Sequence, residues 1–126
     1  PGVKKVFVRS GIRYDYAVAD KDDTFIRHSY NASKAAVLGL TTGMACSYAK
    51  YGITVNAIGP ALFKTNMTEN TLFKSEKFIN GYNMLNPSSR PGKEGDLNGT
   101  ILYLSSDASS YTEGQFIVVD GGGSLV

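Results

Sequence analysis

The sequence predicts an α/β fold in which helices cover both faces of a parallel sheet, and three observations support this prediction. Short β-rich runs alternate with longer helical stretches along the 126 residues, which is the order that builds parallel βαβ units. The run ITVNAIGP at 53–60 is largely apolar, as expected for a strand that is buried on both faces. Hydrophobic residues make up 42% of the chain and charged residues 19%, so the chain can bury the core of one domain, or of part of one.

The first half of the chain is expected to hold two strands and one long helix. The β-rich run at 4–11 predicts a strand, and the charged, aromatic stretch at 12–28 predicts a loop with one short helical turn. Small and apolar residues at 29–51 predict a helix that ends at Gly52, a residue suited to a left-handed cap. The second strand, 53–60, stops at a Gly-Pro pair.

The second half is expected to continue as helix, helix and strand. The polar stretch after residue 60 contains a predicted helix at 68–80 and a predicted loop at 86–92. A further helix is predicted at 94–105, and a last strand at 115–126 runs into glycines. The residues expected to face inward from the 94–105 helix are Ile101, Leu102 and Leu104.

Charge and cysteine content argue against several classes of protein. The chain has 13 Lys and Arg against 11 Asp and Glu, a net charge of +2 with no basic run, so nucleic-acid binding is not expected. No apolar run approaches the ~20 residues that span a bilayer, so no membrane association is expected. The single cysteine, Cys46, suggests a reducing, cytoplasmic setting and is expected to pack in its apolar helix. His28 has no second ligand at metal-binding spacing, so no metal site is expected.

The stretch HSYNASKAAVLGL at 28–40 places Tyr30 four residues before Lys34 on the predicted helix. That spacing is about one helical turn, so the two positions share a face. A free phenol has a pKa of about 10 and is a poor acid or base at neutral pH. A nearby ammonium lowers that pKa, which would make the tyrosine usable in proton transfer. The alternative is an ordinary exposed Tyr–Lys pair, which the spacing alone favours.

A series of motifs in a fixed order favours chemistry. Tyr-x-x-x-Lys is followed by a strand with VNAIGP, by Thr65, by an Arg-Pro-Gly loop and by VVDGG. Together these residues, about 28–123, resemble the carboxyl-terminal half of the short-chain dehydrogenases/reductases, and most of all their gluconate 5-dehydrogenase-like and sugar-alcohol members. The resemblance implies the carboxyl-terminal portion of a Rossmann-like parallel sheet, and NAD or NADP as the cofactor.

The resemblance also implies a role for each matching residue. Tyr30 would exchange a proton with the substrate hydroxyl or carbonyl, while Lys34 would lower its pKa and hydrogen-bond the nicotinamide ribose. Pro60 and Ala61 would line the nicotinamide pocket with backbone groups, and Thr65 would contact the nicotinamide carboxamide. An ordinary turn and an ordinary helix cap explain Pro60 and Thr65 equally well.

Three features of the family are missing from the sequence. No GxxxGxG turn for the cofactor pyrophosphate precedes Tyr30, and the family's Asn-Ala-Gly segment is also missing, so this chain is expected to carry only half of the dinucleotide site. The family's catalytic serine follows a strand about a dozen residues before the tyrosine, where this chain has Ala17 and Val18. Ser10 lies at a strand end farther upstream and is not assigned to the site.

Residues 1–27 do not resemble the dehydrogenase strand that they replace. They resemble a segment of uncharacterised radical-SAM proteins, although the cysteines that would hold an iron–sulfur cluster are absent from the chain. We therefore expect an atypical strand and loop of other origin at 1–27, and the carboxyl-terminal half of a dehydrogenase domain at 28–126. Chance similarity in a divergent dehydrogenase is the alternative.

The expected function is hydride transfer between NAD(P) and a secondary alcohol or ketone of the sugar-acid or polyol class, incomplete in this chain. The alternative is a catalytically silent α/β fragment or chimera that keeps only the family's association surface. In the family that surface comprises the helix at 29–51 and the last strand, and the small residues of this helix suit close packing, so a homo-oligomer is expected. Asp120 and the glycines after it are expected to form a structural turn.

Overall fold

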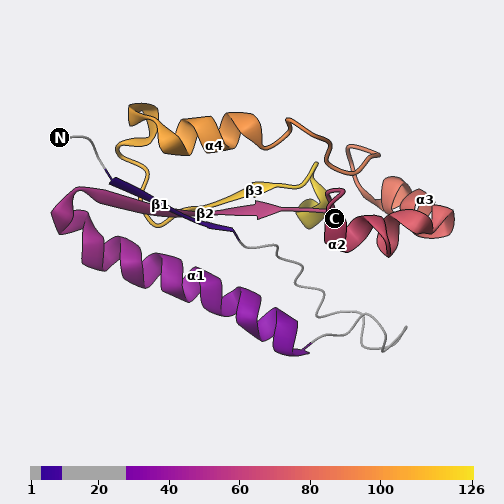
Figure 1. Cartoon of the computed structure of the whole chain (residues 1–126), viewed down its shortest axis with the longest axis horizontal. Coiled ribbons are helices and arrows are strands. Elements are labelled where there is room, and N and C mark those ends of the chain that lie inside the picture. The colour runs from indigo at the N-terminus through magenta and orange to yellow at the C-terminus, as the bar shows by residue number, and fades with distance from the viewer. Residues whose placement is uncertain (1–3, 10–27) are drawn as a thin grey trace.

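The computed structural model describes residues 4–9 and 28–126, and it contains one parallel sheet between two helices. The strand order is β1-β2-β3, with β2 in the centre. The strands are β1 (Lys4–Arg9), β2 (Ile53–Pro60) and β3 (Phe116–Val119). Helix α1 (His28–Tyr48) covers one face and helix α4 (Asn98–Ser105) covers the other, as Figure 1 shows. The predicted α/β fold with a parallel sheet and flanking helices is confirmed.

The central strand pairs with β1 over its first six residues and with β3 over its last four. Its pairing with β1 runs from Lys4↔Ile53 to Arg9↔Ile58, whereas its pairing with β3 begins only at Ala57↔Phe116. Near its amino end, side-chain hydrogen bonds join it to the segment before β3, together with one backbone bond from the Gly114 N–H to the Val55 carbonyl at 2.8 Å. The N–H of Val55 donates to Oε1 of Glu113 at 2.7 Å, and the buried amide of Asn56 bonds the backbone of Thr112 and Gln115 at 2.9 Å each. These bonds fix the chain that leads into β3.

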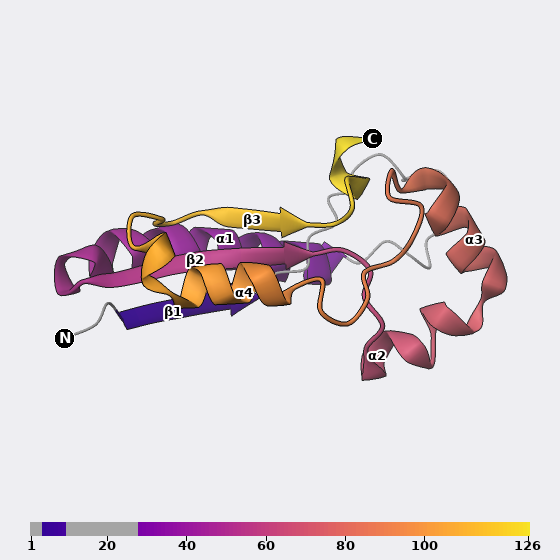
Figure 2. The same cartoon turned by 90° about the horizontal axis from the view of Figure 1, so that it is seen from above.

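The two connections between neighbouring strands pass over opposite faces of the sheet. The chain reaches β2 through α1, behind the sheet in Figure 2, and reaches β3 through α4, in front of it. Because both connections step across the sheet in the same direction, they must have opposite hands. The connection through α4 is the left-handed one, a hand that is rare among parallel crossovers.

Helix α1 ends as the sequence predicted. A 3-10 turn (Ala49–Tyr51) extends it, and Gly52 closes it at φ 69° with its N–H donating to the Ala49 carbonyl at 2.9 Å. The expectation that Cys46 packs inside is wrong, because its side chain is exposed. The helix turns Thr41 and Ala45 toward the sheet instead.

The core is small and centred on β2. Every residue of this strand after Ile53 is buried. The buried apolar residues of the described chain are Ala45, Val55, Ala57, Ile58 and Leu104. From α4 only Leu104 is buried, while Ile101 is 45% and Leu102 69% exposed, so the prediction that these two face inward is wrong. The run ILYL is apolar on several sides of the helix, so its periodicity could not show which side meets the sheet.

Beyond the carboxyl ends of the strands lies a segment that we call the arm, residues 66–85 (Figure 2). It consists of α2 (Asn66–Glu69), a 3-10 turn (Leu72–Lys74) and α3 (Glu76–Leu85). The predicted single helix at 68–80 is therefore wrong. Ser75 interrupts it, because its hydroxyl accepts the N–H of Phe78 at 3.1 Å and starts a new helix.

The segments on either side of α4 also differ from the prediction. The helix begins at Asn98 and not near residue 94, since Gly95 takes φ 92° and the chain turns there. The last strand ends at Val119, and the glycines that follow belong to a turn. The predicted loop at 86–92 is confirmed, and its Gly92 pairs with Phe63 at the base of the arm. In the described ranges no helix has both the length and the apolar content to cross a membrane.

Candidate active site at the carboxyl edge of the sheet

Most of the residues predicted for the active site come together at one end of the molecule. The carboxyl ends of the parallel strands point toward the arm, and the amino end of α1 lies at the same end, because α1 runs antiparallel to the strands (Figure 1). Ligands in open α/β sheets bind outside this edge. Tyr30 and Lys34 belong to the first turns of α1, and Pro60, Ala61 and Thr65 follow β2.

A stripe of covered positions along α1 shows which side of the helix carries Lys34. Thr41 and Ala45 are buried, and Val37, Leu38 and Lys34 are half-buried. These positions recur at helical spacing of three and four residues, so they share one side, the side turned to the sheet. Lys34 is therefore not an exposed lysine on the outer side of the helix. This burial argues against the ordinary exposed pair considered above.

Position 30 continues the same stripe one turn before Lys34. The side chain of Tyr30 lies outside the described part of the structure, so the distance between the phenol and the ammonium stays a prediction. Ser10, Ala17 and Val18, which were considered for the place of the catalytic serine, also lie outside the described residues.

The backbone at the end of β2 is partly used in pairing with β3. Pro60 is buried and pairs with Val119, and the N–H of Ala61 donates to the Val119 carbonyl at 3.1 Å. Neither residue therefore offers an N–H group to a ligand, since proline has none and that of Ala61 is used. The contacts that this segment can still make are through carbonyl oxygens and through the small Ala61 side chain, which is half-buried.

Thr65 forms the amino-terminal cap of α2. Its Oγ1 accepts the N–H of Thr68 at 3.3 Å, and its own N–H donates to Oγ1 of Thr68 at 2.8 Å. Oγ1 of Thr68 in turn donates to the Phe63 carbonyl at 2.8 Å. The two hydroxyls are 3.1 Å apart, so the Thr65 proton points either to Thr68 or to a ligand. The cap explanation of Thr65 is thus correct, and it leaves one donor for a second role.

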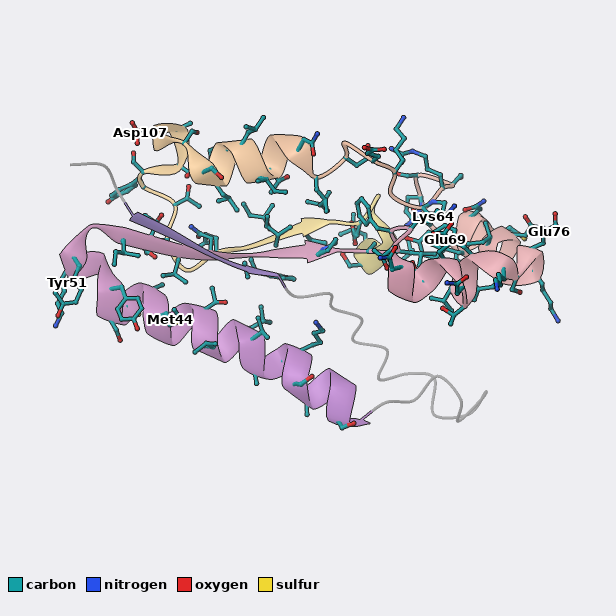
Figure 3. The ribbon with its side chains drawn as sticks, in the orientation of Figure 1. Met44, Tyr51, Lys64, Glu69, Glu76 and Asp107 are labelled. Atoms are coloured by element: carbon teal, nitrogen blue, oxygen red, sulfur yellow. The ribbon has the colours of Figure 1, made fainter. Side chains whose placement is uncertain are left out.

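An exposed ion pair lies beside this cap. Nζ of Lys64 is 2.9 Å from Oε1 of Glu69, and Figure 3 shows the two side chains together near α2, with Glu76 at the far end of the arm. Both side chains are more than half exposed, so their attraction is largely screened by water. They mark the outer surface of the arm and do not form a site.

A hollow of about 240 Å³ lies between the base of the arm, the start of α4 and the end of β3. Of the predicted site residues whose side chains are described, only Ala61 lines it. Two of its charged groups, Arg90 and Asp96, are paired with each other. Nη1 of Arg90 contacts Oδ2 of Asp96 at 2.7 Å, and this hydrogen bond, followed by one from the Lys93 N–H, holds the pKa of Asp96 below its ordinary value. The charges of Arg90 and Asp96 are therefore used within the protein.

Asp120, on the wall of this hollow, organises the turn after β3. Its carboxylate accepts the N–H of Gly122 at 2.9 Å and the N–H of Ser124 at 2.7 Å. Burial alone would raise the pKa of Asp120, but these bonds and one from the Ser124 hydroxyl outweigh it and lower the pKa. Gly121 and Gly122 have φ 64° and 88°, so the predicted structural turn is confirmed.

Sequence reasoning missed one residue of this edge. Asn86, at the end of α3, is only 4% exposed and bonds the turn of Asp120. No sequence signal marks it, because its partner is 34 residues away along the chain. Among the described residues no group of three His, Cys, Asp or Glu side chains is arranged to hold a metal ion.

Comparison with known proteins defines the class to which this fold and edge belong. A family model described as Enoyl-(Acyl carrier protein) reductase matches residues 13–124, which is most of the chain. The chain therefore belongs to the short-chain dehydrogenase/reductase family, whose members are NAD(P)-dependent oxidoreductases with a Rossmann-like fold, as its motif series predicted.

The sequence relatives are sugar-acid and polyol dehydrogenases. Gluconate 5-dehydrogenase of Gluconobacter oxydans is 41% identical over 93 residues, which are 74% of this chain and 36% of that protein. D-arabinitol 2-dehydrogenase of Candida tropicalis is 42% identical over 94 residues, 74% of this chain and 33% of that protein. The chain thus spans about a third of the length of these relatives.

Solved structures agree with the family. A gluconate 5-dehydrogenase from Burkholderia cenocepacia J2315, in complex with NADP and tartrate, superposes with a TM-score of 0.81 at 28% identity, over 97% of this chain and 45% of that one. A short-chain dehydrogenase from Leptospira borgpetersenii with bound NAD+ gives a TM-score of 0.74 at 30% identity, over 94% of this chain and 44% of that one. The proposed division of the chain at residue 27 stays a prediction.

Proposed function

We propose that this chain forms the nicotinamide-proximal, substrate-proximal part of an NAD(P)-dependent dehydrogenase that interconverts a secondary alcohol and a ketone. One observation carries the proposal. Lys34 lies on the sheet-facing stripe of α1, one turn after Tyr30 and at the carboxyl edge of the sheet, in a chain of the short-chain dehydrogenase/reductase family. An ordinary surface pair would have no reason to lie on that side of the helix.

The residues of the chain would handle the proton of the reaction. The nicotinamide, when bound, supplies or accepts a hydride at its C4 atom. In ketone reduction the Tyr30 hydroxyl donates its proton to the carbonyl oxygen, and in alcohol oxidation the phenolate removes the proton of the hydroxyl. The Lys34 ammonium favours the phenolate and offers N–H donors to the nicotinamide ribose.

The Thr65 hydroxyl and the Ala61 carbonyl suit the nicotinamide end of a dinucleotide. A carboxamide needs one donor and one acceptor, and the Thr65 hydroxyl can offer a proton while it keeps the α2 cap. Ala61 can offer its carbonyl oxygen, since its N–H is bonded to β3. The pyrophosphate end is different, because the 126 residues contain no GxxxGxG turn whose amides would cradle it. The chain therefore supplies one half of the cofactor site.

The relatives support a hydroxyl-rich substrate. They include gluconate 5-dehydrogenase, D-arabinitol 2-dehydrogenase and 2-dehydro-3-deoxy-D-gluconate 5-dehydrogenase, each at about 40% identity over three quarters of this chain. We infer that the substrate is a sugar acid or polyol with a secondary alcohol next to further hydroxyls. The arm would border this substrate, because it extends past the same edge as α1's first turns (Figure 2).

Cofactor titration tests the proposal. The purified chain is titrated with NADH and NADPH while nicotinamide fluorescence is followed, and saturation in the micromolar range is expected for one of them. Lys34→Ala should weaken that binding. Tyr30→Phe should keep the binding but abolish oxidation of gluconate or D-arabinitol, because the phenylalanine ring carries no proton to exchange.

A second lysine provides the matched control. Lys50 lies beyond the other end of α1, where its Nζ is 5.0 Å from the centre of the Tyr51 ring, so Lys50→Ala should leave cofactor binding unchanged. The absence of binding by the wild-type chain at millimolar cofactor would contradict the enzyme function for this chain. It would favour the silent fragment that keeps only an association surface.

A groove and exposed apolar side chains support such an association surface. On the outer side of α1 a shallow groove of about 300 Å³ is lined by Gly39, Leu40, Gly43, Met44, Ser47 and Tyr48. Leu40 is 56% exposed although it is apolar, and Val118 on β3 is 45% exposed. We propose that two copies of the chain pack through this groove and through the last strand, as the family resemblance implies.

Oligomeric state tests the association. A Cβ atom at Gly43 would meet nothing within 4 Å, so Gly43→Leu leaves the fold intact but fills the groove. Sedimentation should show a dimer or larger assembly for the wild-type chain and a monomer for Gly43→Leu. The control is Gly81→Leu on α3, where a Cβ also meets nothing and no loss of assembly is expected. A monomeric wild-type chain would contradict this surface.

A further inference from the structure

All the polar groups of Asn86, the residue that follows the arm, form hydrogen bonds. Its N–H donates to the Tyr82 carbonyl at 2.9 Å, and its own carbonyl accepts the N–H of Ser89 at 2.7 Å. Its side-chain Nδ2 donates to the Asp120 carbonyl at 2.8 Å and to Oη of Tyr82 at 3.1 Å, while Oδ1 accepts the N–H of Ser88 at 2.9 Å. Only an amide, with donor and acceptor on one planar group, fits this set.

Ser88 forms a second link to the same turn. Its N–H and its hydroxyl both donate to the Gly121 carbonyl, at 3.0 and 2.9 Å. The turn comes close enough that only glycine fits at position 121, since a Cβ there would lie 2.8 Å from Oδ1 of Asn86. At position 123 a Cβ would lie 2.9 Å from Nδ2 of Asn86. We call this contact of Asn86 and Ser88 with the turn 120–123 the clasp.

The clasp joins a firmly held turn to a loosely held arm. The turn continues β3 and is braced by the Asp120 carboxylate. The arm helices α2 and α3 pack mainly on the 3-10 turn between them, and neither has a comparable contact with the strands, α1 or α4. The arm's other attachment is its base, where the N–H of Gly92 donates to the Leu62 carbonyl at 2.8 Å.

We propose that Asn86 is a positioning residue, which fixes the arm over the carboxyl edge of the sheet through the turn after β3. The base alone would act as a hinge, because it consists of two adjacent chain segments. The clasp adds a second attachment, to a different part of the protein, four residues before Gly92 along the chain. Two attachments restrict the orientation of the arm more than one does. The consequence for catalysis rests on the function proposed above: the arm would be held ready for substrate, and loss of the clasp would weaken substrate binding.

Hydrogen exchange tests the clasp without any substrate. In Asn86→Ala, peptides that cover α2 and α3 should exchange about tenfold faster than in the wild-type chain, because the arm opens locally. Peptides that cover β2 and the middle of α1 should change by less than about twofold. Unchanged exchange in the arm, or an equal increase in the arm and the sheet, would overturn the proposal.

Three further variants control for folding and chemistry. Asn80→Ala removes an exposed amide from the same helix and should leave exchange unchanged. Asn86→Asp keeps the size and the acceptor but loses the donors, so it should loosen the arm as alanine does. Ser88→Ala removes only one side-chain bond and gives a smaller increase, which keeps the test available if Asn86→Ala does not fold.

Kinetics separate positioning from simple destabilisation. With NADPH and 5-keto-D-gluconate, Asn86→Ala should raise KM about tenfold, while the affinity for NADPH changes by less than about twofold. A parallel loss of cofactor affinity and kcat would overturn the positioning role. If the wild-type chain binds no cofactor, the proposed function fails, and hydrogen exchange alone then decides whether the clasp holds the arm.

Discussion

The layered part of the molecule, β1–β3 with α1 and α4, and the arm of α2 and α3 are held by different forces. In the layered part, apolar side chains from α1, β2 and α4 meet in one core, and β2 is buried almost throughout. No arm residue whose burial is described is buried, and the arm helices begin at the hydroxyl caps of Thr65 and Ser75. Burial stabilises the first region, and local hydrogen bonds with one clasp stabilise the second.

The contrast has a functional meaning. Acid–base chemistry needs groups that keep their positions, and Lys34 belongs to the layered part. Segments that adapt to a ligand come from the less stable end of a structure, and the arm fits that description. Each prediction below changes one region and leaves the other intact.

Removal of apolar volume should distinguish the two regions most strongly. Leu104 is 1% exposed, so Leu104→Ala should lower the free energy of unfolding by about 2–5 kcal/mol. Leu85, at the end of the arm, is 74% exposed, and Leu85→Ala should change it by less than about 0.5 kcal/mol. Urea denaturation measures both, and similar losses would show that the arm is part of the core.

Replacement of glycine by alanine should change the stability in opposite directions at two positions. At Gly59, in β2, a new Cβ would lie 2.1 Å from the tip of the Phe116 ring, so Gly59→Ala should destabilise by about 1–3 kcal/mol. At Gly81, within α3, nothing lies near the new Cβ, so Gly81→Ala should stabilise by about 0.5–1 kcal/mol. Thermal unfolding reports both, and a stabilised Gly59→Ala would mean that the sheet is packed more loosely than the structure shows.

Acid should weaken the turn to which the arm is clasped. The pKa of Asp120 is lowered in the folded chain, so its stabilisation is complete above the ordinary value of 3.8 and is lost as the pH falls through the folded pKa. Asp120→Asn should therefore flatten the fall of the urea midpoint at acid pH. Asp107→Asn, on an exposed turn, removes the same charge and serves as the control. An unchanged acid profile in Asp120→Asn would contradict the role of the carboxylate.

The smallest effect is expected on the outer surface of the arm. Glu69→Gln breaks the ion pair with Lys64, and an exposed pair of this kind contributes about 0–1 kcal/mol. The free energy of unfolding should therefore change little, and less still at high salt, where the pair is already screened. A loss as large as that of Leu104→Ala would show that the arm depends on charge and not on its clasp.

The elements that the sequence predicted well are those with local causes. The strand 53–60 was found with its predicted bounds, because an apolar run that ends in Gly-Pro has few alternatives. The end of α1 was found because Gly52 can take the left-handed conformation that closes a helix. Within the arm, one helix was predicted at 68–80, and the structure has two separate helices instead. The caps by Thr65 and Ser75 compete with helical periodicity, and the sequence does not show which hydroxyl accepts an N–H.

The candidate site was predictable only where its features have local causes in the sequence. The spacing of Tyr30 and Lys34 places both on one side of a helix, but only packing shows that this side is turned to the sheet. Pro60, Ala61 and Thr65 were named from motifs, and the structure adds that the N–H groups of Ala61 and Thr65 are already bonded. Asn86 could not be found at all, since its partner in the turn is distant in sequence.

Three features could be predicted without the structure: the order of strands and helices, the helical turn that separates Tyr30 from Lys34, and the glycines that close α1 and follow β3. These depend on backbone sterics and on neighbours within about one turn of chain. Only the folded chain shows which face each helix covers, that Leu104 and not Leu102 meets the sheet, and that Asn86 clasps the turn at Asp120. Such contacts join segments that are far apart along the chain, and burial and hydrogen-bond geometry select them only when the whole chain is folded.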